Sequence, residues 1–210
     1  MSLYIPRHFS PADLDAVRRV LDEFGFATLI TASGAEPMLS HVPVLVEHGP
    51  EGPSAAIGHV AAANPHAAML GKGPALLVFQ GPSGYVSPNW YTSPAQSVPT
   101  WNYVAVHLFG ELERLDEPRD KRGIVDALTA RHEAAFAQPW TSDKMDPALL
   151  QKMLGAIVGF RLRINRVDGK FKLTQNRSAA DRDGVIRGLS SRATPADDLL
   201  AEWMRRYAGA

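Results

Sequence analysis

The stretch from Gly84 to Tyr103 gathers the side chains of this sequence that are most suited to binding a small molecule. It contains two of the four Trp and three of the five Tyr. Hydroxyl and amide side chains lie among these rings, namely Ser87, Asn89, Thr92, Ser93, Thr100 and Asn102. Flat apolar rings beside hydrogen-bonding groups suit a planar ligand with polar edges. Packing within the fold or against a second subunit is the alternative that this composition leaves open.

The remaining residues exclude several kinds of catalytic site. There is no Cys, which excludes disulfides, thiolate zinc sites and a Cys nucleophile. No dinucleotide-binding glycine loop and no G-x-S-x-G elbow occurs, and His132-Glu133 lacks the second His of a zinc protease. The seven His are scattered, and three of them, His41, His59 and His107, lie in predicted strands. Such a His is either a hydrogen-bonded structural residue or a ligand contact.

Charge and composition favour a single soluble domain over a nucleic-acid or membrane protein. The 22 Lys and Arg balance the 22 Asp and Glu, so no net field attracts DNA phosphates. A local basic group after Gln175 is interleaved with acids and is typical of a solvated helix face. No signal segment and no membrane-spanning run is present, so we expect one cytoplasmic domain over residues 1–210.

Hydrophobic periodicity predicts the elements that position these residues. Strands are expected at 26–32, 37–47, 55–61, 75–80, 100–114 and 156–167. Helices are expected from a Ser10 cap to Phe24, over 64–70 with Asn64 as cap, after Pro118, over 147–154, and twice beyond about residue 177. Prolines 88, 94 and 99 predict a stiff loop between two strands. The pattern is typical of a mainly β fold, an antiparallel barrel with helices inserted and appended.

A pair of lysines follows the last predicted strand. Asp168-Gly169 is a tight-turn signal, so residues 170–176 are expected to fold back as an edge segment. Lys170 and Lys172 are two apart and would project from the same face of that segment. They are either a solvated edge or a pair that holds a phosphate, with Gln175 and Asn176 as neutral donors.

Five motifs in order along the chain resemble the PaiB family. They are Tyr4-x-Pro6-x-His8-Phe9, Gly58-His59-Val60-Ala61 with Asn64-Pro65-His66, Gln80-Gly81-Pro82 with Tyr85–Tyr91, Val98–Tyr103 and Gly169–Asn176. Members of that family are FMN-binding split-barrel proteins, often labelled negative transcriptional regulators and distantly similar to pyridoxamine 5′-phosphate oxidases. They often carry a Lys in the loop after Trp-Tyr, where this chain has Ser93-Pro94-Ala95.

The resemblance implies a homodimer in which FMN lies between the subunits at the rim of a split barrel. The resemblance implies that six residues lie along the isoalloxazine ring of FMN, namely His41, Val42, Pro43, His59, Val60 and Ala61. It places Asn64 beside the phosphate or ribityl chain. The resemblance implies that the walls of the FMN site are formed by Ser87, Trp90, Tyr91, Thr100, Trp101 and Asn102. It implies that the opposite end of this site is approached by Lys170, Lys172, Gln175 and Asn176.

Three functions remain open on this resemblance. The first is a flavin-linked reductase or oxidase, and the second is haem binding through His41, His59 or His107. The third is a DNA-binding repressor, for which Arg182 and Arg187 are the local candidates although no helix-turn-helix is evident. No metal ligands are expected.

Overall fold

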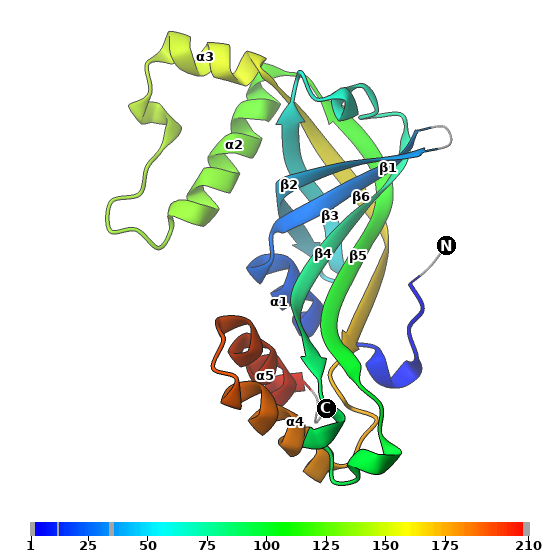
Figure 1. Ribbon diagram of the computed structural model, residues 1–210. Helices are drawn as coiled ribbons and strands as arrows, with labels where there is room; N and C mark the ends of the chain where they lie inside the picture. Colours follow the sequence, from blue (N-terminus) through cyan, green and yellow to red (C-terminus); the bar gives the residue numbers. More distant parts are fainter. Residues whose placement is uncertain (1–2, 12, 34–35, 208–210) are drawn as a thin grey trace. The chain divides into compact units, whose positions relative to one another are not determined.

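Six strands form the sheet of this protein in the computed structural model, which describes residues 3–11, 13–33 and 36–207 (Figure 1). They are β1 (Phe26–Ser33), β2 (Glu36–Gly49), β3 (Gly52–Ala61), β4 (Gly73–Val86), β5 (Thr100–Leu115) and β6 (Ile157–Lys172). The strand order β1-β2-β3-β6-β5-β4 closes on itself, because β4 pairs with β1. The antiparallel barrel expected from the sequence is therefore confirmed.

Helices occupy the connections and the C-terminal part of the chain. The α-helices are α1 (Leu14–Glu23), α2 (Pro118–Glu133), α3 (Pro147–Gly155), α4 (Ala179–Ser191) and α5 (Pro195–Tyr207). Short 3-10 turns are η1 (Arg7–Phe9), η2 (Pro65–Ala68), η3 (Pro88–Trp90), η4 (Pro94–Gln96) and η5 (Ser142–Lys144). No helix among the described residues is both long and apolar enough to cross a membrane.

Contacts divide the chain into two compact units. Unit 1 takes its described residues from 1–20, 80–106 and 168–210, and unit 2 takes them from 21–79 and 107–167. In unit 2, the core contains Leu29, Leu77, Phe79, Leu108, Phe160 and Leu162, none of which is exposed to solvent. Helix α2 buries Ile124 and Leu128 and packs against α3 (Figure 1).

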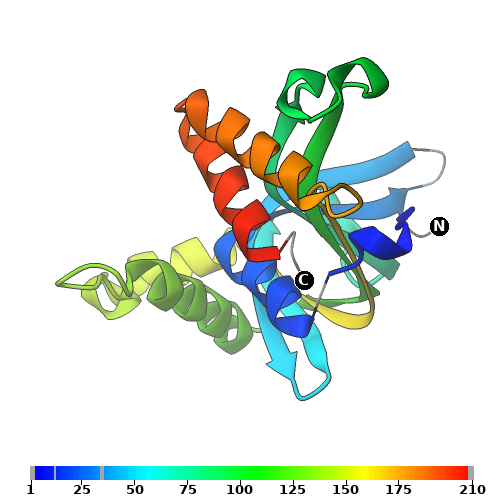
Figure 2. The same cartoon turned by 90° about the horizontal axis from the view of Figure 1, so that it is seen from below.

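Unit 1 is built around the C-terminal helix pair. Helices α4 and α5 lie side by side (Figure 2), and α5 buries an apolar stripe that includes Leu200, Trp203 and Met204. Its Trp203 is fully buried, with its ring centre 5.9 Å from that of Phe171 on β6. Helix α4 carries Gly184 and Gly188 one turn apart, and a β-carbon at Gly188 would collide with the indole of Trp90. The two glycines therefore form a notch on α4 against which Trp90 packs.

The turn predicted at Asp168-Gly169 is wrong, because β6 continues through it to Lys172. Two contacts within unit 1 hold the pair in the extended strand. The Asp168 carboxylate accepts a hydrogen bond from the backbone N–H of Leu3 at 3.1 Å. A β-carbon at Gly169 would come within 2.6 Å of Pro11 Cγ, so the glycine serves close packing rather than a reversal.

The predicted start of the first helix is also corrected. Asp13, rather than Ser10, caps α1, because its Oδ1 accepts a hydrogen bond from the Ala16 N–H at 2.7 Å. Ser10 instead follows η1 in an extended conformation. Ala12, which lies between them, is outside the described residues.

Candidate functional site

Pro43 and His59, two of the predicted ligand-binding residues, line one cavity in unit 2. Its volume is about 300 Å³. The two residues come from β2 and β3, and the facing wall comes from α2 and the segment that follows it. That wall consists of Val125, Leu128, Thr129, His132, Glu133 and Trp140. We call this space the His59 cavity.

The imidazole of His59 is the polar group that stands out in this cavity. Its Nδ1 atom is buried and has no hydrogen-bond partner among the described residues. Burial lowers the pKa of His59, which favours the neutral form of the ring. A buried nitrogen without a partner is costly in a finished structure. A ligand with a hydrogen-bonding edge would satisfy it.

Trp140 is fixed at the mouth of the His59 cavity by the end of α2. Its backbone N–H donates to Glu133 Oε2 at 2.8 Å, which ties the linker to the helix. The indole remains 39% exposed, so an aromatic face is available beside the cavity. With Pro43 and Leu128 it gives the cavity apolar walls around a few polar atoms, as small-molecule sites have.

Asn64 has a structural role beside this region, in a polar network of unit 2. Its Oδ1 accepts from the His66 N–H at 2.9 Å, which confirms the predicted cap, and its Nδ2 donates to Ser40 Oγ at 3.0 Å. His66 is fully buried, with Nδ1 2.9 Å from Ser40 Oγ and Nε2 3.0 Å from Thr31 Oγ1. Both functional ends of the Asn64 amide are therefore used by the protein itself.

The other predicted residues of unit 2 divide between surface and core. His41 is exposed, shares a hydrogen bond with Thr28 Oγ1 at 3.0 Å and stacks on Phe26. Val42 and Val60 are buried in the core, and Ala61 ends β3 at the surface. Because their side chains are buried, Val42 and Val60 could contact a ligand only with their backbone atoms.

Five predicted residues come together in unit 1, around a cavity of about 200 Å³. These residues are Tyr91, Thr100, Asn102, Lys172 and Asn176. Phe9, Val98, Thr174 and Arg177 complete the lining. We call this space the Lys172 cavity.

The ammonium groups of Lys170 and Lys172 have different hydrogen-bond partners. Lys172 lines the cavity and donates to Thr100 Oγ1 and, at 2.6 Å, to the Trp101 carbonyl. Lys170 is only 8% exposed and donates to the Tyr4 carbonyl at 2.7 Å. Its ammonium also lies 5.5 Å from the ring centre of Tyr103, close enough for a cation–π contact.

The remaining predicted residues of unit 1 do not line the Lys172 cavity. Ser87 caps η3 by accepting from the Asn89 N–H at 3.2 Å, and Trp90 packs on α4. Trp101 is 57% exposed and meets Tyr85 edge to face. Gln175 bonds to its own segment, accepting from Leu173 N–H and donating to the Phe171 carbonyl.

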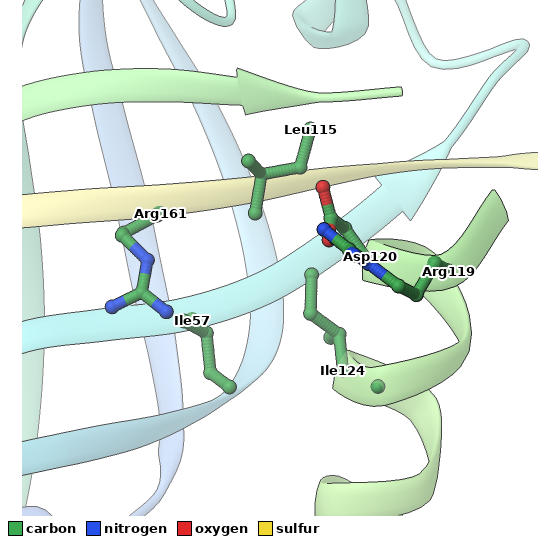
Figure 3. A pocket seen from close by; sticks show the side chains of 7 residues that line it. Ile57, Leu115, Arg119, Asp120, Ile124 and Arg161 are labelled. Atoms are coloured by element: carbon green, nitrogen blue, oxygen red, sulfur yellow. The ribbon is translucent and has the colours of Figure 1, made fainter. Parts of the chain in front are cut away.

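A further cavity of about 370 Å³ lies in unit 2, between β3, β6 and the start of α2 (Figure 3). Its two arginines have other partners. Arg161 pairs with Glu47 at 2.6 Å, and Arg119 lies 3.6 Å from Asp120. The described lining contains none of the residues that the sequence predicts for a ligand. Among the described residues, no group of three or more His, Asp or Glu could hold a metal ion.

Several lining residues escaped the sequence analysis. Thr129, His132, Glu133 and Trp140 belong to the helix after Pro118 and the segment that follows it, where the sequence analysis weighed only His132-Glu133, as an incomplete zinc-protease motif. Arg177 was assigned to a solvated helix face, yet it lies in the turn before α4. Thr174 adopts a φ of 71°, which nothing in its sequence context indicates.

Comparison with solved structures supports the barrel fold. The FAD and haem binding protein from Mycobacterium smegmatis superposes with a TM-score of 0.55 at 22% identity, covering 75% of this chain and 70% of that one. The flavocytochrome Anf3 from Azotobacter vinelandii gives a TM-score of 0.56 at 18% identity, covering 80% and 72%. At these identities the likeness concerns the fold alone.

Sequence comparison identifies the family. The protein PAI 2 of Bacillus subtilis, named for protease synthase and sporulation, is 32% identical over 206 residues, covering 96% of each chain. A family model described as "Putative FMN-binding domain" matches residues 3–166. That match includes every residue of the His59 cavity. The chain therefore belongs to the FMN-binding domain family, to which its sequence motifs had pointed.

Proposed function

We propose that the protein binds FMN and that the His59 cavity receives the isoalloxazine ring. The observation that carries the proposal is the buried Nδ1 of His59, which lacks a partner inside a cavity with apolar walls. Membership of the FMN-binding family supports the same ligand. A mononucleotide also agrees with the absence of a dinucleotide-binding loop from the sequence.

The residues of the cavity suit a flavin ring chemically. Pro43, Leu128 and Trp140 offer apolar contact, which the ring needs on its faces. The neutral imidazole of His59 can either donate or accept, and the flavin edge carries both kinds of group. Bound FMN supplies electron transfer in one- or two-electron steps. The protein's part is to hold and orient the ring.

Titration of FMN into the full chain tests the proposal directly. We expect flavin fluorescence to be quenched and the unfolding temperature to rise with FMN concentration. His59→Leu should weaken binding by about 1 kcal/mol, the scale of one lost hydrogen bond. His107→Leu is the matched control, because it removes an imidazole of the same unit that does not line the cavity. Absence of any FMN response in the wild-type chain would overturn the proposal.

Haem is the second candidate ligand, and the same imidazole favours it. A neutral His without a partner in an apolar cavity is a suitable axial ligand for haem iron. Haem added to the chain would then give a Soret band that His59→Leu removes, with no response to FMN. That result would replace the flavin proposal.

We further propose flavin-linked reductase or oxidase activity. The support is the family and the open mouth beside Trp140, from which an electron donor could reach the ring. Anaerobic mixing of the FMN-loaded chain with NADH or NADPH should bleach the flavin absorbance. Restoration of the colour by oxygen would identify an oxidase, and restoration only by another acceptor would identify a reductase.

The exposed face of β1 and β2 supports a homodimer. Phe26 and Leu39 are 69% and 54% exposed, and they lie on this face together with Ile30, His41 and Pro43. Cross-strand pairing places Phe26 opposite Pro43 and Ile30 opposite Leu39, so the apolar side chains form a stripe that the polar pair Thr28 and His41 interrupts. Such a stripe on the outer face of a sheet is typical of a subunit interface. We infer that a second copy of the chain covers it.

A further inference from the structure

The Lys172 cavity carries positive charge that no acidic residue in its lining balances. Lys172 and Arg177 both line it, and none of its described lining residues is an Asp or Glu. Among the described residues, neither side chain makes an ion pair within 4.0 Å. Asp181 attracts Arg177 electrostatically, but its carboxylate is engaged by Thr92, which donates its N–H and hydroxyl at 2.8 Å each.

The surroundings of Lys172 add a second indication. Its partners are two neutral oxygens, those of Thr100 and the Trp101 carbonyl. Burial, and then the nearby charge of Lys170, lower the pKa of Lys172. A bound anion would oppose both effects, because it would stabilise the charged ammonium.

Backbone strain at the cavity is a third and independent observation. Thr174 is β-branched and 4% exposed, yet it has a φ of 71°. This conformation is rare for such a residue and occurs mostly where function or packing imposes it. Asn102 Nδ2 donates to Thr174 Oγ1 at 2.7 Å. The strained turn brings Asn176 and Arg177 to the cavity beside these groups.

We propose that the Lys172 cavity is a binding site for a phosphate monoester group. Two cations five residues apart, with hydroxyl groups beside them, suit a dianion with three oxygens better than a monoanionic carboxylate. Phe9 and Tyr91 give the cavity an aromatic wall for the body of the ligand. The match to the family model ends at residue 166, before Lys172 and Arg177, whereas the motif Gly169–Asn176, which contains Lys172, is one of those that resemble PaiB proteins.

Inorganic phosphate is the probe, measured by calorimetric titration of the full chain without flavin at constant ionic strength. We expect binding in the wild type and a loss of about tenfold or more in Lys172→Met and in Arg177→Gln, each of which removes a charged hydrogen-bond donor. Arg187→Gln is the matched control, because it removes one positive charge from α4 outside the cavity. Lys172→Arg, which keeps the charge, should retain binding.

Two results would overturn the site. One is the absence of phosphate binding to the wild-type chain. The other is a loss in Arg187→Gln equal to that in Lys172→Met and Arg177→Gln, which would show general charge attraction only. Because flavin is left out, neither result bears on the His59 cavity.

Competition identifies the molecule that delivers the phosphate. If FMN displaces inorganic phosphate and riboflavin does not, the group is the flavin's own phosphate. If FMN and phosphate bind together, the ligand is a separate phosphorylated molecule. Both outcomes require the site, and they differ only in its occupant.

Discussion

At the scale of single residues, the buried imidazole of His66 links stability to pH. Burial lowers the pKa of His66 below its usual value of 6.5, and both ring nitrogens are hydrogen-bonded. Between the folded-state pKa and 6.5, the unfolded chain therefore binds more protons than the folded chain. Stability should be full above pH 6.5 and fall as the solution is acidified. The pKa of His59, which burial also lowers, acts in the same direction.

Chemical denaturation between pH 5 and pH 7.5 measures this effect. His66→Asn should be less stable at neutral pH, because it breaks the network, and should lose less stability on acidification. A nuclear magnetic resonance titration of His66 that gave a pKa at or above 6.5 would contradict the prediction.

The sequence indicated some of the residues that line cavities, but it did not indicate the distant residues that lie beside them. His59, Tyr91, Thr100, Asn102 and Lys172 do line cavities, because polar or aromatic side chains at strand ends are a local signal. The partners that complete each cavity come from segments far away in sequence. Trp140 and His59 line one cavity although they are distant in sequence, and Lys170, unlike Lys172, donates to the Tyr4 carbonyl. No local pattern contains such information.

At the scale of elements, the notch in α4 predicts a specific defect. Gly188→Ala places a methyl group where the Trp90 indole lies, so unit 1 should lose about 1–3 kcal/mol of stability, as overpacked sites do. Gly123→Ala is the control within α2, because a β-carbon there meets nothing within 4 Å. That change should be neutral or stabilise by up to about 1 kcal/mol. Equal unfolding temperatures for the two variants would argue against the notch.

The apolar stripe of β1 and β2 predicts a change in assembly. Leu39→Glu puts a charge into the inferred interface and should shift the chain from dimer to monomer at equal concentration. Sedimentation equilibrium measures the mass directly. Glu51→Leu, an exposed change at the turn between β2 and β3, is a control that should leave the dimer intact. A wild-type chain that sediments as a monomer would refute the inferred dimer.

Strands were located well from sequence, but their ends and turns were not. Runs of alternating or β-branched residues identified all six strands of the barrel. The Asp168-Gly169 signal failed because contacts to Leu3 and Pro11, far away in sequence, stabilise the extended form. Tertiary contacts of this kind outweigh a local turn preference.

At the scale of the whole molecule, we expect one folding domain. Strands β4, β5 and β6 each contribute residues to both compact units, so neither unit has a complete set of strands alone. Differential scanning calorimetry should show a single cooperative transition, and FMN should raise its temperature. Two separate transitions, of which only one responds to FMN, would instead indicate two domains.

The distribution of charged side chains does not support direct binding to DNA, which stays a prediction. The exposed side chains of α5 carry both signs, Asp198 and Glu202 with Arg205 and Arg206. Arg182, one of the two candidate contacts, donates to the Arg177 carbonyl at 2.8 Å. Salt-dependent retention on DNA that is lost when Arg182 and Arg187 are neutralised would support the regulator.

The N-terminal segment has a consequence for proteolytic trimming. Tyr4 covers the buried Lys170 with its carbonyl and its ring, and Leu3 is tied to Asp168. A protease that cut after Phe9 would remove these partners and leave an ammonium group in apolar surroundings. Cleavage near the first residues would therefore also destabilise the end of β6, where Lys172 lies two positions after Lys170. We therefore predict that removal of residues 3–9 would weaken phosphate binding at the Lys172 cavity, whose lining includes Phe9.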